Sequence, residues 1–121
     1  LELDVFTDEF LRDNLIKAEF FFEVTHSIDR NFRADIIMYD ANDQITYSFA
    51  VDIMPDGNNE VVTTHTEVFE DALLEQLKNT VRLELVLSMF PSSSGIPLDE
   101  NSIGNIKMRS KATLFFQIDN E

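Results

Sequence analysis

Alternation of apolar and polar residues is the feature that most limits what this chain folds into. Between Lys17 and Ile28, apolar side chains occupy nearly every second position. Successive side chains of an extended strand point to opposite faces, so this pattern predicts a half-buried β-strand. The same pattern recurs at Phe32–Tyr39, Gln44–Ile53, Val81–Phe90 and Lys107–Ile118. We therefore expect an all-β protein.

Two further segments complete the predicted strands. Glu60–Glu67 is rich in Val and Thr, and Glu2–Phe6 is a short first strand. Asp8–Leu15 and Asp71–Lys78 do not alternate, and we interpret them as short helical turns, the second with Thr66 as its start signal. About seven strands with short turns predict an antiparallel β-sandwich, immunoglobulin-like in architecture. Because no linker divides the chain, residues 1–121 are expected to form a single domain.

Composition excludes several classes of function. The 121 residues include no Cys, which excludes disulfides, thiol catalysis and cysteine-based zinc sites. With 23 acidic and 9 basic residues, the formal net charge is −14, so phosphate backbones and anionic lipid surfaces repel the chain. No apolar run approaches the ~18 residues of a transmembrane helix. We expect an acidic protein that binds no nucleic acid and has no transmembrane segment.

Four segments carry a resemblance to a known class of protein. They are the hairpin at Asn31–Asp43, the strand at Thr63–Glu67, the turn at Leu77–Thr80 and the strand at Lys107–Thr113. In these segments the chain resembles uncharacterised lipoprotein-type, all-β envelope domains of Bacteroidota-type bacteria. The resemblance implies a location in the periplasm or at the outer-membrane surface and no assigned catalytic residues. Membrane attachment would then depend on a lipid anchor, whose cysteine is not in this sequence.

Sequence motifs for catalysis are absent. Ser92–Ser94 lacks the Gly-x-Ser-x-Gly nucleophile elbow, and none of the three glycines lies in a phosphate-binding motif. His26 and His65 fall on separate predicted strands, where a hydrogen-bonded histidine is expected more often than a zinc ligand. We therefore expect a protein that is not an enzyme. The alternative is a glycosidase or other hydrolase, which would need a cleft with converging acid and base groups.

Acidic turns make calcium the one candidate cofactor. A calcium ion takes ~6–8 oxygen ligands, and two predicted turns each offer three. These residues are Asp40, Asn42 and Asp43 in one turn, and Asp56, Asn58 and Glu60 in the other. Asp99–Asn101 is a third acidic cluster. Asp and Asn also favour turns for backbone reasons, so a solvated turn without a metal is the alternative.

The face opposite the expected core is unusually apolar for a solvated sheet. It carries six large side chains, at Phe21, Ile37, Tyr39, Val86, Phe90 and Phe115. If they cluster, they form a surface that binds a protein partner; otherwise the helical turns and the long loop cover them. The sequence therefore predicts a non-enzymatic interaction or structural domain of the bacterial cell envelope, which binds through a sheet face or an edge strand. A calcium-assisted carbohydrate-binding or adhesive module is the alternative.

Overall fold

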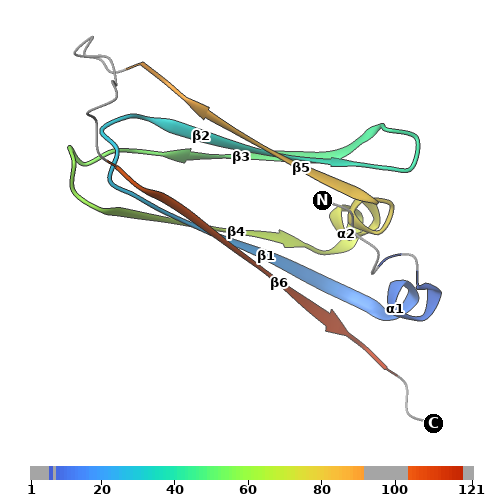
Figure 1. The fold of residues 1–121 in the computed structure, drawn as a ribbon. Helices are drawn as coiled ribbons and strands as arrows, with labels where there is room; N and C mark the ends of the chain where they lie inside the picture. The colour runs from blue at the N-terminus through green and yellow to red at the C-terminus, as the bar shows by residue number, and fades with distance from the viewer. Residues whose placement is uncertain (1–5, 7, 92–103, 119–121) are drawn as a thin grey trace.

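Six strands and two short helices make up the regular structure of the described residues. The computed structural model describes residue 6, residues 8–91 and residues 104–118. The elements are α1 (Glu9–Asn14), β1 (Leu15–His26), β2 (Phe32–Tyr39), β3 (Ile45–Ile53), β4 (Val61–Phe69), α2 (Asp71–Lys78), β5 (Arg82–Met89) and β6 (Ile106–Phe116). The strands form two antiparallel sheets, ordered β4-β1-β6 and β3-β2-β5, which lie in two layers (Figure 1).

The prediction of a mostly β, sandwich-like fold is confirmed at this level, with two differences. The described residues contain six strands rather than seven. Of the expected strand at Glu2–Phe6, residues 2–5 lie outside the described residues, and Phe6 is buried in the core without belonging to a strand. The immunoglobulin-like architecture stays a prediction.

The bounds predicted for α2 are those of the structure, but the start signal assigned to Thr66 was wrong. Thr66 lies within β4, and the helix begins only at Asp71, after Glu70 in the cap position. β4 continues past Thr66 because Phe69 is fully buried between the sheets. Burial of that ring outweighs the local start signal of a threonine hydroxyl.

β1 and β2 are the central strands of their sheets. β1 pairs with β4 on one side and with β6 on the other, so Phe20 lies opposite both Glu67 and Ala112. β2 pairs in the same way with β3 and β5, and Ile36 lies opposite Phe49 and Leu85. Directly opposed residues of antiparallel strands share a face, so these registers show which side chains of every strand point between the sheets.

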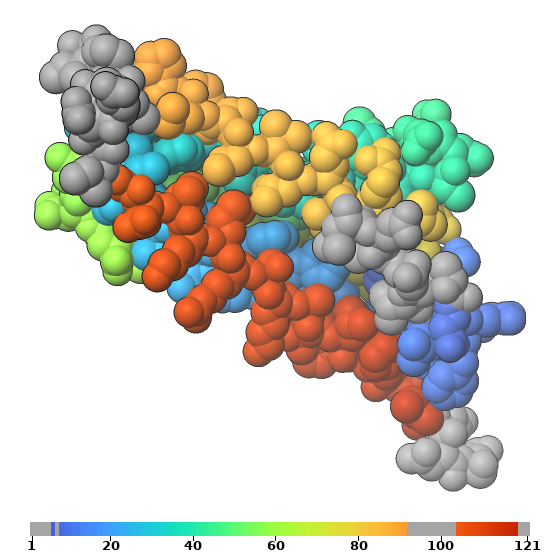
Figure 2. All heavy atoms as spheres, viewed as in Figure 1, coloured from blue at the N-terminus to red at the C-terminus, as the bar shows by residue number. Residues whose placement is uncertain are grey.

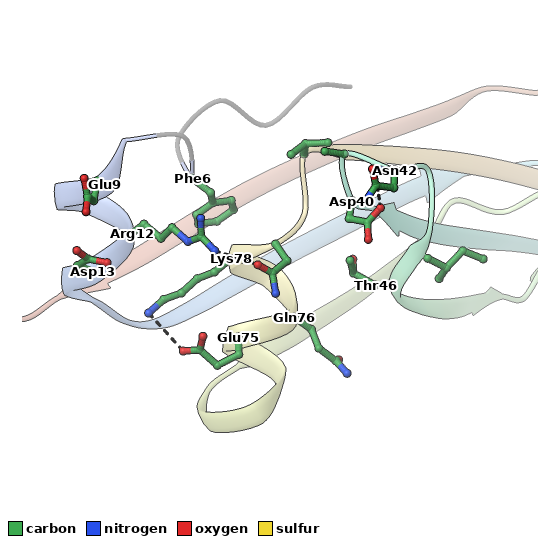
Figure 3. A pocket seen from close by; sticks show the side chains of 14 residues that line it. Phe6, Glu9, Arg12, Asp13, Asp40, Asn42, Thr46, Glu75, Gln76 and Lys78 are labelled. Carbon is green, nitrogen blue, oxygen red and sulfur yellow. Dashed lines mark hydrogen bonds and ion pairs between the residues drawn. The ribbon is translucent and has the colours of Figure 1, made fainter.

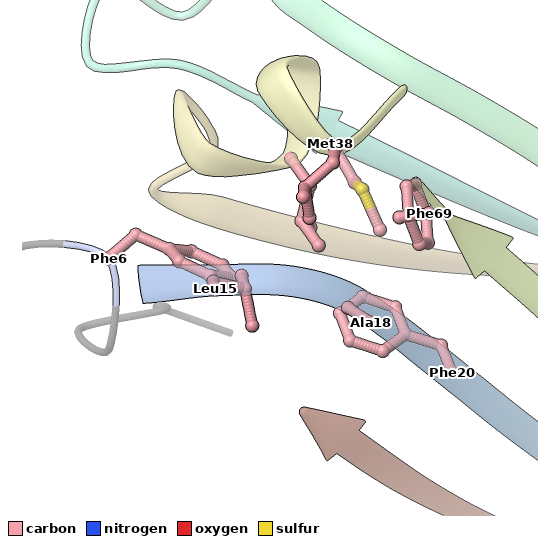
Figure 4. Close-up of a cluster of buried hydrophobic side chains, with 8 residues drawn as sticks. Phe6, Leu15, Ala18, Phe20, Met38 and Phe69 are labelled. Carbon is pink, nitrogen blue, oxygen red and sulfur yellow. The ribbon is translucent and has the colours of Figure 1, made fainter. Parts of the chain in front are cut away.

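The core lies between the layers in two clusters of alternate residues. One cluster joins β1 and β4 to the helical end of the sandwich, where α2 contributes Leu74 and Leu77 (Figure 4). The other lies towards the opposite end and consists of Val24, Phe32, Ala34, Ile36 and Ile53. α2 is thus a cap on the open end of the core, which is why its buried positions recur at helical spacing.

One side of the sandwich is closed by contacts between edge strands β3 and β4. The rings of Tyr47 and Phe69 meet edge to face at 5.3 Å, and those of Phe49 and His65 stack at 5.4 Å. The Tyr47 hydroxyl also donates a hydrogen bond of 2.6 Å to Glu67. Both sheets are therefore joined along this side.

Candidate functional site

The opposite side of the sandwich, between edge strands β5 and β6, is open. Figure 2 shows the blue part of the chain through the gap between these two strands. By register, Leu85, Leu87 and Met89 of β5 share a face with buried residues of β2 and point between the sheets. Their exposed fractions are nevertheless 43%, 39% and 51%. Three core-facing apolar side chains therefore remain in contact with solvent.

Small residues on β6 explain why this side does not close. The inward-facing positions opposite Phe22 and Phe20 of β1 are Ser110 and Ala112, and both are exposed. Neither side chain is long enough to fill the space that faces β5. The result is a slot of about 450 Å³ between the edge strands, which we call the β5–β6 slot. It is lined by Phe22, Arg82, Leu83, Glu84, Leu85, Met108, Arg109 and Ser110.

Beside the slot lies the outer edge of β6, which has no strand partner among the described residues. β5 and β6 are the terminal strands of their sheets, and each is paired on one side only among the described strands. An unpaired row of N–H and C=O groups is a template for pairing with another extended chain. The slot therefore combines an apolar floor with the outer edge of β6, which has no strand partner among the described residues.

Electrostatically, β6 differs from the rest of this acidic chain. Its outer face carries Lys107, Arg109 and Lys111, and the strand contains no acidic residue. Within the described part of the chain, none of these three cations forms an ion pair within 4 Å. In contrast, Arg82 of β5 lies 4.0 Å from the centre of the Tyr39 ring and pairs with both Asp43 and Glu84. The edge next to the slot is thus cationic, and its three cations form no ion pair with any described residue.

The six residues predicted to bind a partner do not form one patch. Phe21 and Phe115 lie on the outer face of the β4-β1-β6 sheet, and they are separated along it because Phe21 is opposite Lys111. The other four, Ile37, Tyr39, Val86 and Phe90, belong to or directly follow strands of the second sheet. The two groups face away from each other across the sandwich. The main contacts of α2 are with β1, β3 and β4 at the end of the core, and most of the long loop lies outside the described residues.

The first predicted calcium turn, at Asp40–Asp43, is structured by its own side chains. Asp40 accepts hydrogen bonds from the backbone N–H groups of Asn42 and Gln44, at 2.8 and 2.9 Å. Asp43 pairs with Arg82. The turn that contains Asp56, Asn58 and Glu60 lies at the other end of β3. Among the described residues no three His, Asp or Glu side chains converge as a metal site. Calcium binding stays a prediction, and Asp99–Asn101 and Ser92–Ser94 lie outside the described residues.

The histidines are engaged in separate hydrogen bonds. His26 is 1% exposed; its Nδ1 accepts from the N–H of Ile28 and its Nε2 lies 3.0 Å from the carbonyl of Met54. His65 lies 2.7 Å from Glu67 on the same strand. The Tyr47 hydroxyl donates a hydrogen bond to the same Glu67 carboxylate. That hydrogen bond, together with burial, raises the pKa of Tyr47 to about 12. These contacts support the reading of both histidines as structural.

A second hollow lies between the helices and the β2–β3 turn (Figure 3). It is larger, at about 1190 Å³, and mostly polar. Its cations are held by neighbours: Arg12 donates to Asn79 at 2.9 Å, and Lys78 lies 3.6 Å from Glu75. With acidic groups such as Asp13 and Asp40 interspersed among them, the lining favours no single ligand charge. The β5–β6 slot is therefore the better candidate.

Sequence reasoning missed the slot because its residues look like core. Leu83, Leu85 and Met108 share the parity of buried residues, and alternation alone assigns them to the interior. The one available signal is the pair of small residues Ser110 and Ala112 in an otherwise bulky inward-facing row.

Comparisons with known proteins leave the function to be argued from this geometry. No protein-family model matches the chain, and no curated protein or solved structure matches it at a significant level. None of the helices in the described residues is both long and apolar enough to cross a membrane.

Proposed function

We propose that this domain is a non-enzymatic interaction domain, which binds an extended segment of a protein partner along the β6 edge with side chains inserted into the β5–β6 slot. This mode is β-strand addition: main-chain hydrogen bonds supply affinity, and alternate side chains of the ligand supply specificity. The cell envelope remains our proposed location, and it rests on the resemblance described above.

One observation carries this proposal: apolar side chains that face the core are exposed beside the β6 edge, which is unpaired among the described strands. A closed sandwich buries such residues against the opposite sheet, and each buried leucine contributes about 1.5–3 kcal/mol. Here Leu85 and Met108 lack that cover, although the β3–β4 side of the same sandwich has it. An inserted strand would supply the missing contacts and pair with the free backbone groups at the same time.

Filling the slot tests the proposal. Ser110→Phe places a ring where the small hydroxymethyl group leaves space between β6 and Leu85. The probe is a fluorescein-labelled peptide of about nine alternating valine and threonine residues, a length matched to an edge strand. Fluorescence anisotropy should show saturable binding to the unmodified protein and at least about tenfold weaker binding to the variant.

Ser48→Phe is the matched control, because Ser48 is exposed on β3, far from the slot. This variant should bind the peptide as the unmodified protein does. A peptide with proline at its centre should bind poorly, since proline cannot donate to a strand ladder. Equal binding by both phenylalanine variants, or no saturable binding of the alternating peptide at all, contradicts the proposal.

A further inference from the structure

We infer that the strand captured at β6 alternates apolar and acidic residues, with its acidic side chains on the outer face beside Lys107, Arg109 and Lys111. This inference rests on the proposed function and specifies the chemistry of the partner. It follows from the register of β6 and from the distribution of its charges.

The alternation of side chains along β6 shows which side chains of an added strand would point into the slot and which would lie on the outer face. Residues opposite one another on paired antiparallel strands share a face. Positions of the ligand beside Met108, Ser110 and Ala112 therefore point into the slot, where Phe22 and Leu85 present apolar surface. The intervening positions lie beside the three cations on the outer face of the sheet.

Charge complementarity predicts acidic residues at the outer positions of the captured strand. Lys107, Arg109 and Lys111 are three of nine basic residues in a chain with 23 acidic ones, and they lie at every second position of one exposed strand. On β1, the next strand inward, Glu23 lies opposite Arg109, yet no ion pair forms between them within 4 Å. Cross-strand carboxylates at the free edge would pair all three cations.

The net charge of −14 does not outweigh this local pattern. At physiological salt the screening length is about 8–10 Å, so distant carboxylates contribute little to a ligand that touches β6. The same cations also argue against a second copy pairing β6 with β6. Antiparallel pairing of two identical strands would place lysines and arginines of one copy beside those of the other, which is destabilising.

Three peptides of about nine residues test the assignment: valine alternating with glutamate, with threonine or with lysine. At about 50 mM NaCl we expect the glutamate peptide to bind about tenfold more tightly than the lysine peptide, and the ratio to fall as salt is added. Arg109→Gln with Lys111→Gln should reduce that ratio to about twofold. The control is Ser48→Glu with Thr66→Glu, which changes the net charge equally on edge strands remote from the slot; it should leave the ratio unchanged.

The outcomes separate the two proposals. If the threonine peptide binds but the glutamate peptide gains no advantage over the lysine peptide, the acidic partner is wrong and strand capture stands. If none of the three binds, strand capture itself fails.

Two other occupants are tested in parallel. Leu1→Ser with Leu3→Ser removes two of the three apolar positions of this chain's own Leu-Glu-Leu-Asp-Val segment. If the peptide binds only to that variant, the occupant of the slot is this chain's own segment. If light scattering shows a dimer that the peptide dissociates, the occupant is a second copy. Either result would refute the proposal that the slot binds a separate partner.

Discussion

Tyr47→Phe removes a single oxygen atom from the contact that closes the β3–β4 side of the sandwich. The Tyr47 hydroxyl donates to Oε1 of Glu67 at 2.6 Å, while His65 lies beside Oε2 of the same carboxylate. A hydrogen bond to a charged acceptor contributes about 1.5–3 kcal/mol to the free energy of unfolding. Because the contact is only partly buried and His65 still holds Glu67, we expect a loss of about 1–2 kcal/mol.

The pH dependence of this loss provides the sharper test. Folding raises the pKa of Tyr47 to about 12, first through its hydrogen bond to Glu67 and then through burial. An unfolded tyrosine titrates near about 10. The folded chain therefore holds the phenolic proton more tightly, so the stabilisation is complete below pH ~10 and is lost as the pH rises towards about 12.

Urea unfolding of the unmodified protein and of Tyr47→Phe should be followed by circular dichroism at several values between pH ~8 and ~11.5. The difference in unfolding free energy between the two should be constant up to pH ~10 and shrink above it. Other groups titrate in this range, but their effects cancel in the difference. In a Glu67→Gln background the same substitution should cost less and lose most of its pH dependence. A gap that stays constant through pH ~11.5 would refute the reasoning.

Three further predictions concern stability, each measured by urea unfolding. Leu77→Ala should cost about 2–5 kcal/mol because it opens a cavity under the α2 cap, whereas Leu73→Ala on the exposed side of the helix should cost less than about 1 kcal/mol; similar losses would show that α2 does not cap the core. His26→Leu should cost about 1–3 kcal/mol because it leaves two backbone groups without their hydrogen-bond partner, and an unchanged midpoint would contradict this. Gly57→Ala should cost about 1 kcal/mol through its backbone φ of +55° alone, since no atom lies within 4 Å of the added methyl group; a stabilised variant would argue against that conformation.

Local pattern predicted the strands well where one face is fully buried. Phe32–Tyr39 was predicted with the bounds of β2, because this central strand has a neighbour on each side and buries every second residue. The Asp71–Lys78 helix was likewise predicted with the bounds of α2. β4 shows the limit of the method. Its inward-facing positions include Thr63, His65 and Glu67, whose polarity gives no sign that they point between the sheets. Glu67 is accommodated there only because Tyr47 and His65, from two strands, satisfy its carboxylate.

The candidate site could not be predicted from local sequence pattern, for a different reason. Leu85 has the same parity as buried Ile36 beside it, and its exposure depends on the size of Ser110, which lies 25 positions later in the chain and in the other sheet. Once β6 is placed there, however, the chemistry of the slot follows from alternation. A shift of β6 by one residue would turn Lys107, Arg109 and Lys111 inward and expose the opposite face. Such a shift would also remove Ile106, Leu114 and Phe116 from the core clusters against which they pack. That loss disfavours the shifted register, so the pattern that builds the sandwich also gives the slot its apolar floor and cationic rim.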